Sequence, residues 1–437
     1  MAVVESLIQR YQSQIRDNQL QIVNDVDVTN FEFLSKTQIQ KVTLIQCLNF
    51  KFAHPLQSLR QLQINHSQLS DLNNIYELTN LLKLDLSNNH IEILTQLPDQ
   101  LTELKLNQNK IRDISVLRNL KLKVLEISRN QVSDISVINQ TELQVLIANN
   151  NQIINVDELQ NSISLLDLSQ NQIRNIKFVH KMINAKIINL GFNQITDISY
   201  IQQFAQLEQL TLNNNQITEF KQTLPNLKIL DLRNNQVQNL EHIQKCPKLT
   251  QLYVENNAVE SLKGIEQLKL EILYAANNKI SDIQQIRNMT SIETLDLANN
   301  LITDIYPLKK LVNVQLLYLN HNRILNAEVI NHLAIIKTLF INNNKIDPLV
   351  FKNSINGSSA FQTEQNNEEK AVNLRINIVH LSQELQQDIL KRKQKVVTVQ
   401  KTQLQQKALK VLEQDSQMHQ KIAFAYSNKV NQEIADQ

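Results

Sequence analysis

The side chains that could support catalysis are scattered along the sequence and form no catalytic pattern. The nine histidines include no H-E-x-x-H pair that could hold zinc. The two cysteines, Cys47 and Cys246, have no C-x-x-C partners and predict neither a disulfide framework nor a metal site. The 437 residues include only three glycines, which excludes the glycine-rich loops that bind nucleotide phosphates. We therefore expect no enzyme activity, no cofactor and no metal.

Positive and negative charges are almost balanced. Lys and Arg number 44 and Asp and Glu 42, so the formal net charge is +2 and no global field attracts nucleic acid or anionic membrane. No segment approaches the roughly 18 apolar residues that span a bilayer, and the first residues lack a signal-peptide pattern. We expect no nucleic-acid partner, no membrane association and a cytoplasmic location, with a nuclear one left open.

One pattern recurs along most of the chain. The segment LLKLDLSNNHIEIL, which begins at Leu81, has the spacing L-x-x-L-x-L-x-x-N-x-I-x-x-L. The frame returns every 20 to 22 residues, and about fifteen units are expected from Ile39 to Leu349. The ladder position is the asparagine of this frame, with Cys and Ser in the first two units. Its residues are Cys47, Ser67, Asn89, Asn109, Asn130, Asn151, Asn171, Asn193, Asn215, Asn235, Asn257, Asn278, Asn300, Asn322 and Asn344.

Each residue type in the frame has a structural reason. In L-x-L the two leucines point to one side of a short strand and the middle residue to the other. One coil cannot bury its leucines alone, so stacking the next coil completes the core. The amide of asparagine can satisfy backbone groups where the chain turns inward, and Cys and Ser do this less well. The pattern predicts a curved α/β solenoid with one parallel sheet on its concave face and short 3-10 or helical turns outside.

These repeats resemble the leucine-rich repeat family, in particular its short class of about 22 residues. That class occurs in a regulatory subunit of type-1 protein phosphatase and in bacterial internalins. The resemblance covers roughly three quarters of the chain. It implies a non-catalytic scaffold or adaptor that holds a partner protein on its concave face.

Four segments follow from the repeat boundaries. Residues 1–34 are expected to form an N-terminal helical cap in which LQIVND and FEFL are strand-like pieces, 35–352 the solenoid and 353–370 a polar linker. Residues 371–437 contain no Pro or Gly and have apolar residues at helical spacing, which predicts an α-helical tail. The tail could fold back as a cap, or it could pair with another helix as a coiled coil and mediate self-association; both readings stay open.

The residue between the two strand leucines should lie on the concave face. Towards the C-terminus this row is aromatic, with Tyr253, Tyr274, Tyr318 and Phe340. Rigid aromatics with a polar tip are frequent hot spots, so these four are candidate partner-binding residues. They could instead serve packing, or lie beneath the tail. The acidic members are further candidates: Asp85, Glu126, Asp167, Asp231 and Asp296.

Two more specific functions are alternatives to a general scaffold. One is a regulatory subunit of type-1 protein phosphatase, because Lys421 to Phe424 matches a short basic, Val/Ile, x, Phe docking pattern. The other is an internalin-like surface adhesin, which the expected absence of a signal peptide disfavours. The sequence does not identify the partner.

Overall fold

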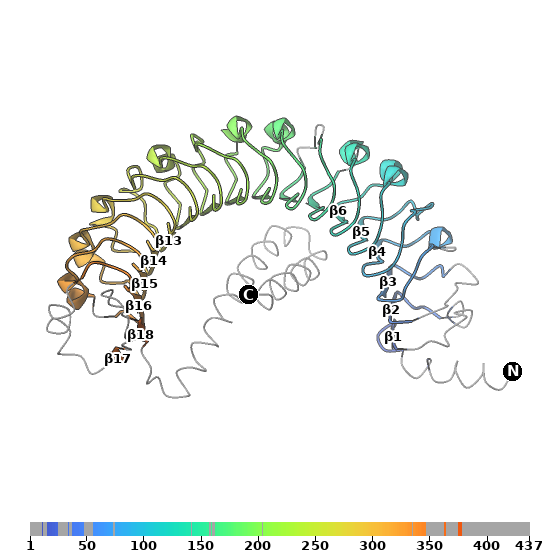
Figure 1. Cartoon of the computed structure of the whole chain (residues 1–437). Helices are drawn as coiled ribbons and strands as arrows, with labels where there is room; N and C mark the ends of the chain where they lie inside the picture. Colours follow the sequence, from blue (N-terminus) through green and yellow to red (C-terminus); the bar gives the residue numbers. More distant parts are fainter. Residues whose placement is uncertain are drawn as a thin grey trace. The chain divides into compact units, whose positions relative to one another are not determined.

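The computed structural model describes most of the repeat region (Figure 1). The described residues are Tyr11, 15–24, Leu34, 37–47, 56–72, 75–140, 142–156, Leu159, 162–202, 204–333, 335–346, 362–363 and 375–377. The chain divides into two compact units. Unit 1 comprises Met1–Gly357 and Glu364–Ile376, and unit 2 comprises Ser358–Thr363 and Asn377–Gln437. The repeat coils belong to unit 1.

Sixteen short strands form one parallel sheet, each strand pairing with the strands of the neighbouring coils. They are β1 (Gln19–Val23), β2 (Lys41–Ile45), β3 (Gln61–Asn65), β4 (Lys83–Asp85), β5 (Glu103–Lys105), β6 (Val124–Glu126), β7 (Val145–Ile147), β8 (Leu165–Asp167), β9 (Ile187–Asn189), β10 (Gln209–Thr211), β11 (Ile229–Asp231), β12 (Gln251–Tyr253), β13 (Ile272–Tyr274), β14 (Thr294–Asp296), β15 (Leu316–Tyr318) and β16 (Thr338–Phe340).

The sheet lines the inner side of the curved unit, and short 3-10 helices lie on its outer side (Figure 1). The expected solenoid with a parallel sheet and short outer turns is therefore confirmed. The described 3-10 helices are η2 (Ile75–Glu77), η3 (Ser115–Asn119), η4 (Ser136–Gln140), η5 (Lys177–Lys181), η6 (Ser199–Gln202), η7 (Glu241–Lys245), η8 (Gln284–Ile286), η9 (Tyr306–Lys310) and η10 (Glu328–His332).

The hydrophobic core runs between the sheet and the outer turns. Strand leucines such as Leu252 and Leu273 are fully buried, and they occupy equivalent positions in neighbouring strands. Since the side-chain period of a strand is two, burying these leucines directs the residues on either side of them to the concave face. The core thereby fixes which residues a partner can reach.

The ladder side chains tie each coil to the one before it. Asn215 Nδ2 donates to the carbonyl oxygens of Leu190 at 3.0 Å, Leu212 at 3.0 Å and Asn213 at 3.3 Å. Its Oδ1 accepts the Ile195 N–H at 3.0 Å. One amide thus satisfies backbone groups of two coils, as the donor and acceptor capacity of asparagine allows. At the N-terminal end the Ser67 hydroxyl accepts the Cys47 N–H at 3.1 Å, so the same position is kept with a smaller group.

The residue before each ladder position has a left-handed backbone, a feature that the repeat frame alone does not predict. Across all fifteen coils its φ lies between 52° and 61°. Asparagine tolerates this region better than most residues, because its short polar side chain can bond locally. The recurring Asn-Asn pair therefore has two separate causes. The first asparagine suits the left-handed turn, and the second forms the ladder.

Further strands lie at the two ends of the array. β1 lies inside the segment predicted to be a helical cap, and it pairs in parallel with β2. Within the predicted helical tail, β18 (Arg375–Asn377) instead pairs antiparallel with β16. Such pairing satisfies backbone groups that the edge of a sheet leaves open. The strand β17 (Gln362–Thr363) lies in the predicted linker. The rest of the linker and tail, including Lys421 to Phe424, lies outside the described residues.

Replacing Asn215 by Leu should leave the backbone groups that it serves unpaired in a buried place. We expect a cost of about 1–3 kcal/mol in the free energy of unfolding. Because each coil contacts only its neighbours, the loosening should be local to the coils around β10. Hydrogen exchange followed by mass spectrometry, together with a melting curve, measures both effects. Gln216→Leu changes the exposed adjacent residue and is the matched control. Equal exchange in both variants would contradict the role given to the ladder.

Candidate functional site

Three parallel rows of side chains cover the concave face. The middle row contains the nine predicted binding residues, because strand pairing places Tyr253 beside Tyr274 and Tyr274 beside Asp296. Asp296 is in turn beside Tyr318, and Tyr318 beside Phe340. The rows two residues before and two residues after this one flank it. We call the stretch from β12 to β16 the aromatic segment of the face.

The N-terminal part of the face carries a chain of ion pairs. Lys105 Nζ donates to Glu126 Oε1, and Asn107 Nδ2 donates to Glu126 Oε2 at 2.8 Å. Lys83 Nζ lies 2.9 Å from Glu103 Oε2. Burial lowers the pKa of the Lys105 ammonium, but Glu126 and Glu103 more than offset this and the pKa is raised. These cations and carboxylates therefore neutralise one another.

The other acidic residues N-terminal to the aromatic segment also have partners within the chain. The Asp167 carboxylate accepts hydrogen bonds from Ser169 Oγ at 2.7 Å and Asn149 Nδ2 at 3.2 Å. Asp231 binds the Arg233 guanidinium through both of its oxygens, at 3.0 and 2.7 Å. The Asp85 carboxylate accepts hydrogen bonds from the Ser87 N–H at 3.0 Å and from Asn65 Nδ2 at 3.5 Å. The structure brings these acids into one row, but as internally satisfied groups instead of an open acidic surface.

The four predicted aromatic residues form two stacked pairs. The rings of Tyr253 and Tyr274 lie 5.5 Å apart with an 11° angle between their planes. Those of Tyr318 and Phe340 lie 5.1 Å apart at 8°. The Arg233 guanidinium lies 5.4 Å from the centre of the Tyr253 ring. All four rings are half-buried, so each keeps surface that a partner can cover.

Asp296 lies between the two aromatic pairs. Its Oδ1 accepts the Ala298 N–H at 3.0 Å, and burial raises the pKa of its carboxyl. Burial also raises the pKa of the Tyr274 phenol to about 12, so this hydroxyl stays protonated near neutral pH and can donate a hydrogen bond.

Glu255 also lies on the concave face, but it is outside the middle row and was not among the predicted binding residues. It follows Tyr253 by two residues and therefore points to the same side of the sheet. Its Oε2 is buried and has no hydrogen-bond partner among the described residues. Burial, and to a lesser extent the charges of Asp231 and Asp296, raises the pKa of its carboxyl to about 7. Reading the row after the strand would have found both Glu255 and Arg233.

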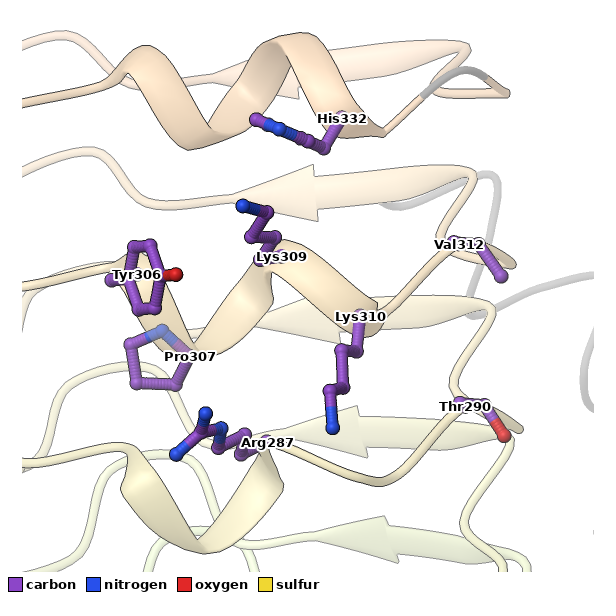
Figure 2. A pocket seen from close by; sticks show the side chains of 8 residues that line it. All are labelled: Arg287, Thr290, Tyr306, Pro307, Lys309, Lys310, Val312 and His332. Atoms are coloured by element: carbon purple, nitrogen blue, oxygen red, sulfur yellow. The ribbon is translucent and has the colours of Figure 1, made fainter.

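A depression lies on the convex side, between η8, η9 and η10 (Figure 2). Its volume is about 620 Å³. Three of its lining residues, Arg287, Lys309 and Lys310, are cationic, and no carboxylate lines it. Lys310 Nζ donates to Asn288 Oδ1 at 3.2 Å, and Lys309 Nζ lies 5.5 Å from the centre of the Tyr306 ring. The depression contains none of the predicted binding residues.

The described residues assemble no arrangement for covalent or metal chemistry. In that part of the chain no group of three or more His, Cys, Asp and Glu residues could hold a metal ion. Both cysteines are buried, and burial raises the pKa of the Cys246 thiol to about 11, which disfavours the reactive thiolate. The helices of the same part include none long and apolar enough to cross a membrane. The concave face, which contains the nine predicted binding residues, is therefore the candidate site considered below.

Replacing Glu255 by Gln should reduce the pH dependence of stability. The folded-state pKa of about 7 lies above the ordinary 4.5, so the folded protein binds more protons between these values. The free energy of unfolding should therefore fall as the pH rises from 4.5 to 7, and Glu255→Gln should remove part of that fall. Denaturant titrations across this range measure it. Glu260→Gln, at an exposed position, is the control. A pH slope equal to the wild type in Glu255→Gln would refute the raised pKa.

Family models match part of the repeat region. The model described as "Leucine Rich repeats (2 copies)" matches residues 225–267 and 268–310, and the model "Leucine Rich Repeat" matches residues 80–104. The chain has no significant match among curated proteins.

Solved structures with the same architecture extend the similarity. An internalin from Listeria monocytogenes is 27% identical with a TM-score of 0.57, over 67% of this chain and 83% of that chain. A leucine-rich repeat protein from Leptospira interrogans is 26% identical with a TM-score of 0.63, over 77% of this chain and 87% of that chain. A plant peptide hormone receptor, solved in complex with RGF2, shares the fold at 19% identity with a TM-score of 0.52, over 76% of this chain and 66% of that chain. The family models and these solved structures together support the reading of the coils of unit 1 as leucine-rich repeats.

Proposed function

We propose that this protein is a non-catalytic scaffold that holds a partner protein on the concave face of its repeat array. The observation that carries the proposal is the aromatic segment, where two stacked ring pairs stand half-buried on one strand row. Aromatic side chains bury large areas at low entropic cost and are enriched at the centres of interfaces. The peptide hormone receptor with the same fold supports binding as the general use of such an array.

The arrangement of charge adds to this proposal. The N-terminal part of the concave face neutralises its charges internally, through pairs such as Lys105 with Glu126. A surface of that kind offers a partner little electrostatic gain, because its charges already have partners. We therefore place the energetic centre of binding in the aromatic segment and assign the ion-paired part a structural role.

A second candidate is a surface adhesin, favoured by the similarity to the Listeria internalin at 27% identity. The two candidates share the concave binding surface and differ in where the protein works. We propose the intracellular scaffold first, because the two cysteines are free and buried. Protease treatment of intact cells followed by immunoblotting separates the candidates. Degradation of the protein while a cytoplasmic marker survives would favour the adhesin.

The phosphatase-regulator alternative rests on Lys421 to Phe424, which lie outside the described residues. It stays a prediction from the sequence. Pull-down of the full chain, with and without substitution of Phe424 by Ala, tests it. Equal recovery of phosphatase by the two chains would remove the motif from consideration.

Replacing Tyr274 and Tyr318 together by Ala should abolish partner capture. We expect recovery of bound proteins by the immobilised full chain to fall more than about tenfold, corresponding to about 1.4 kcal/mol. Each substitution also removes one stacked ring, so a small drop in melting temperature should accompany it. Affinity capture with quantitative mass spectrometry, together with melting curves, measures both effects.

The matched control replaces Tyr76 and Tyr306 by Ala, because these exposed tyrosines lie on the outer 3-10 turns. It should capture the same proteins as the wild type. If the concave double variant retained the captured set and only melted earlier, the aromatic segment would be structural and the proposal would be wrong.

A further inference from the structure

Asp296 has two aromatic walls. Its strand lies between those of Tyr274 and Tyr318, so the two tyrosines are separated by two strand spacings, about 9.6 Å. Each of these rings stacks nearly parallel on the ring of its outer neighbour, at a distance close to one strand spacing. The ring faces therefore look along the array. The inner faces of Tyr274 and Tyr318 look towards the space above Asp296, and we call this space the Asp296 slot.

The residues beside Asp296 on its own strand are small. Thr294 and Ala298 flank it, and Ala276 occupies the place of Ala298 on the preceding coil. Both alanines are buried, so their methyl groups do not extend to the height of the tyrosine rings. The slot thus has a carboxylate at its base, aromatic walls on two sides and small residues on the flank.

Among the described residues, the Asp296 carboxylate lacks the cationic partner that other carboxylates of the face have. Glu126 has Lys105, and Asp231 has Arg233. Among the described residues, the Asp296 carboxylate accepts one hydrogen bond, from the Ala298 N–H two residues later in the sequence. Its negative charge therefore has no cationic partner in this part of the chain.

A guanidinium group is complementary both to the rings of Tyr274 and Tyr318 and to the carboxylate of Asp296. A cation midway between the two rings would lie about 5 Å from each ring centre, within the roughly 6 Å over which an aromatic face attracts a cation. Arginine also stacks on aromatic faces through its planar group and donates two parallel hydrogen bonds to a carboxylate. Lysine offers a point charge without the planar stacking surface.

We propose that the Asp296 slot binds an arginine side chain of the partner protein. The proposal rests on the function proposed above, because it assigns a chemistry to the partner held on the concave face. Asp296 accepts the guanidinium hydrogen bonds, and Tyr274 and Tyr318 enclose the group. The partner presents a basic segment, with at least one arginine directed into the face.

Saturation-transfer difference NMR with the full chain tests the slot, because it detects weak binding of small peptides to a large protein. The probes are acetyl-Ser-Gly-Arg-Gly-Ser amide and the same peptide with lysine, or with citrulline, in place of arginine. Citrulline keeps the planar shape and removes the charge. We expect the arginine peptide to bind, the lysine peptide to bind several-fold more weakly and the citrulline peptide at least tenfold more weakly.

Variants assign the binding to the slot. Asp296→Asn keeps an acceptor for the Ala298 N–H and removes the charge, and it should weaken the arginine peptide about tenfold. Tyr274→Leu and Tyr318→Leu should each weaken it several-fold, with melting curves verifying the fold. Glu260→Gln makes the same change in net charge at an exposed site and should bind like the wild type. Equal binding of arginine and citrulline, equal binding of lysine, or unchanged binding to Asp296→Asn would each overturn the proposal.

Two variants distinguish a failure of the arginine-binding proposal from a failure of the scaffold proposal. If Asp296→Asn captured every partner as well as the wild type while the Tyr274 and Tyr318 double alanine variant lost them, the concave face would bind its partner without an arginine in the slot. If both variants captured like the wild type, the proposed binding surface itself would be wrong.

Discussion

The rest of the structure depends on the hydrogen bonds of the ladder side chains. In coil after coil one buried amide accepts an N–H of the preceding coil and donates to carbonyl oxygens of both coils, as Asn193 does with Ile173, Leu168 and Leu190. Short strands of three residues have few backbone bonds of their own to hold them in register. The ladder holds the coils at a fixed spacing, and this spacing aligns equivalent side chains on the concave face. Stacked ring pairs such as Tyr253 with Tyr274 depend on that alignment.

Two requirements meet at each inward turn, and they explain the composition of the chain. The ladder position needs an amide, and the residue before it needs a backbone at positive φ. Asparagine suits both positions, so Asn-Asn pairs recur while glycine is nearly absent from the sequence. Gly191 is a local exception, and a Cβ there would lie 2.1 Å from Oδ1 of the Asn213 side chain on the next coil.

Much of this architecture could be predicted from the sequence, because leucine and asparagine spacing report directly on burial and on backbone hydrogen bonds. The frame placed the strands, the ladder and the middle concave row. It did not predict β18, because pairing at a sheet end is decided by open backbone groups and not by a repeated side-chain pattern. The frame also could not predict that the Asp231 carboxylate forms an ion pair while the Asp296 carboxylate accepts only a backbone N–H. That difference depends on whether the flanking row supplies an arginine, as at Arg233, or an alanine, as at Ala298.

The partner should contact the aromatic segment and not the outer turns. Solvent footprinting measures this difference most directly. Hydroxyl-radical labelling of the full chain would be compared with and without the partner recovered by affinity capture. Tyr306, exposed on η9, is the internal reference. We expect strong protection of Tyr274, Tyr318 and Phe340 with unchanged labelling of Tyr306. Protection of Tyr306 and the convex depression, with the concave rings labelled as before, would contradict it.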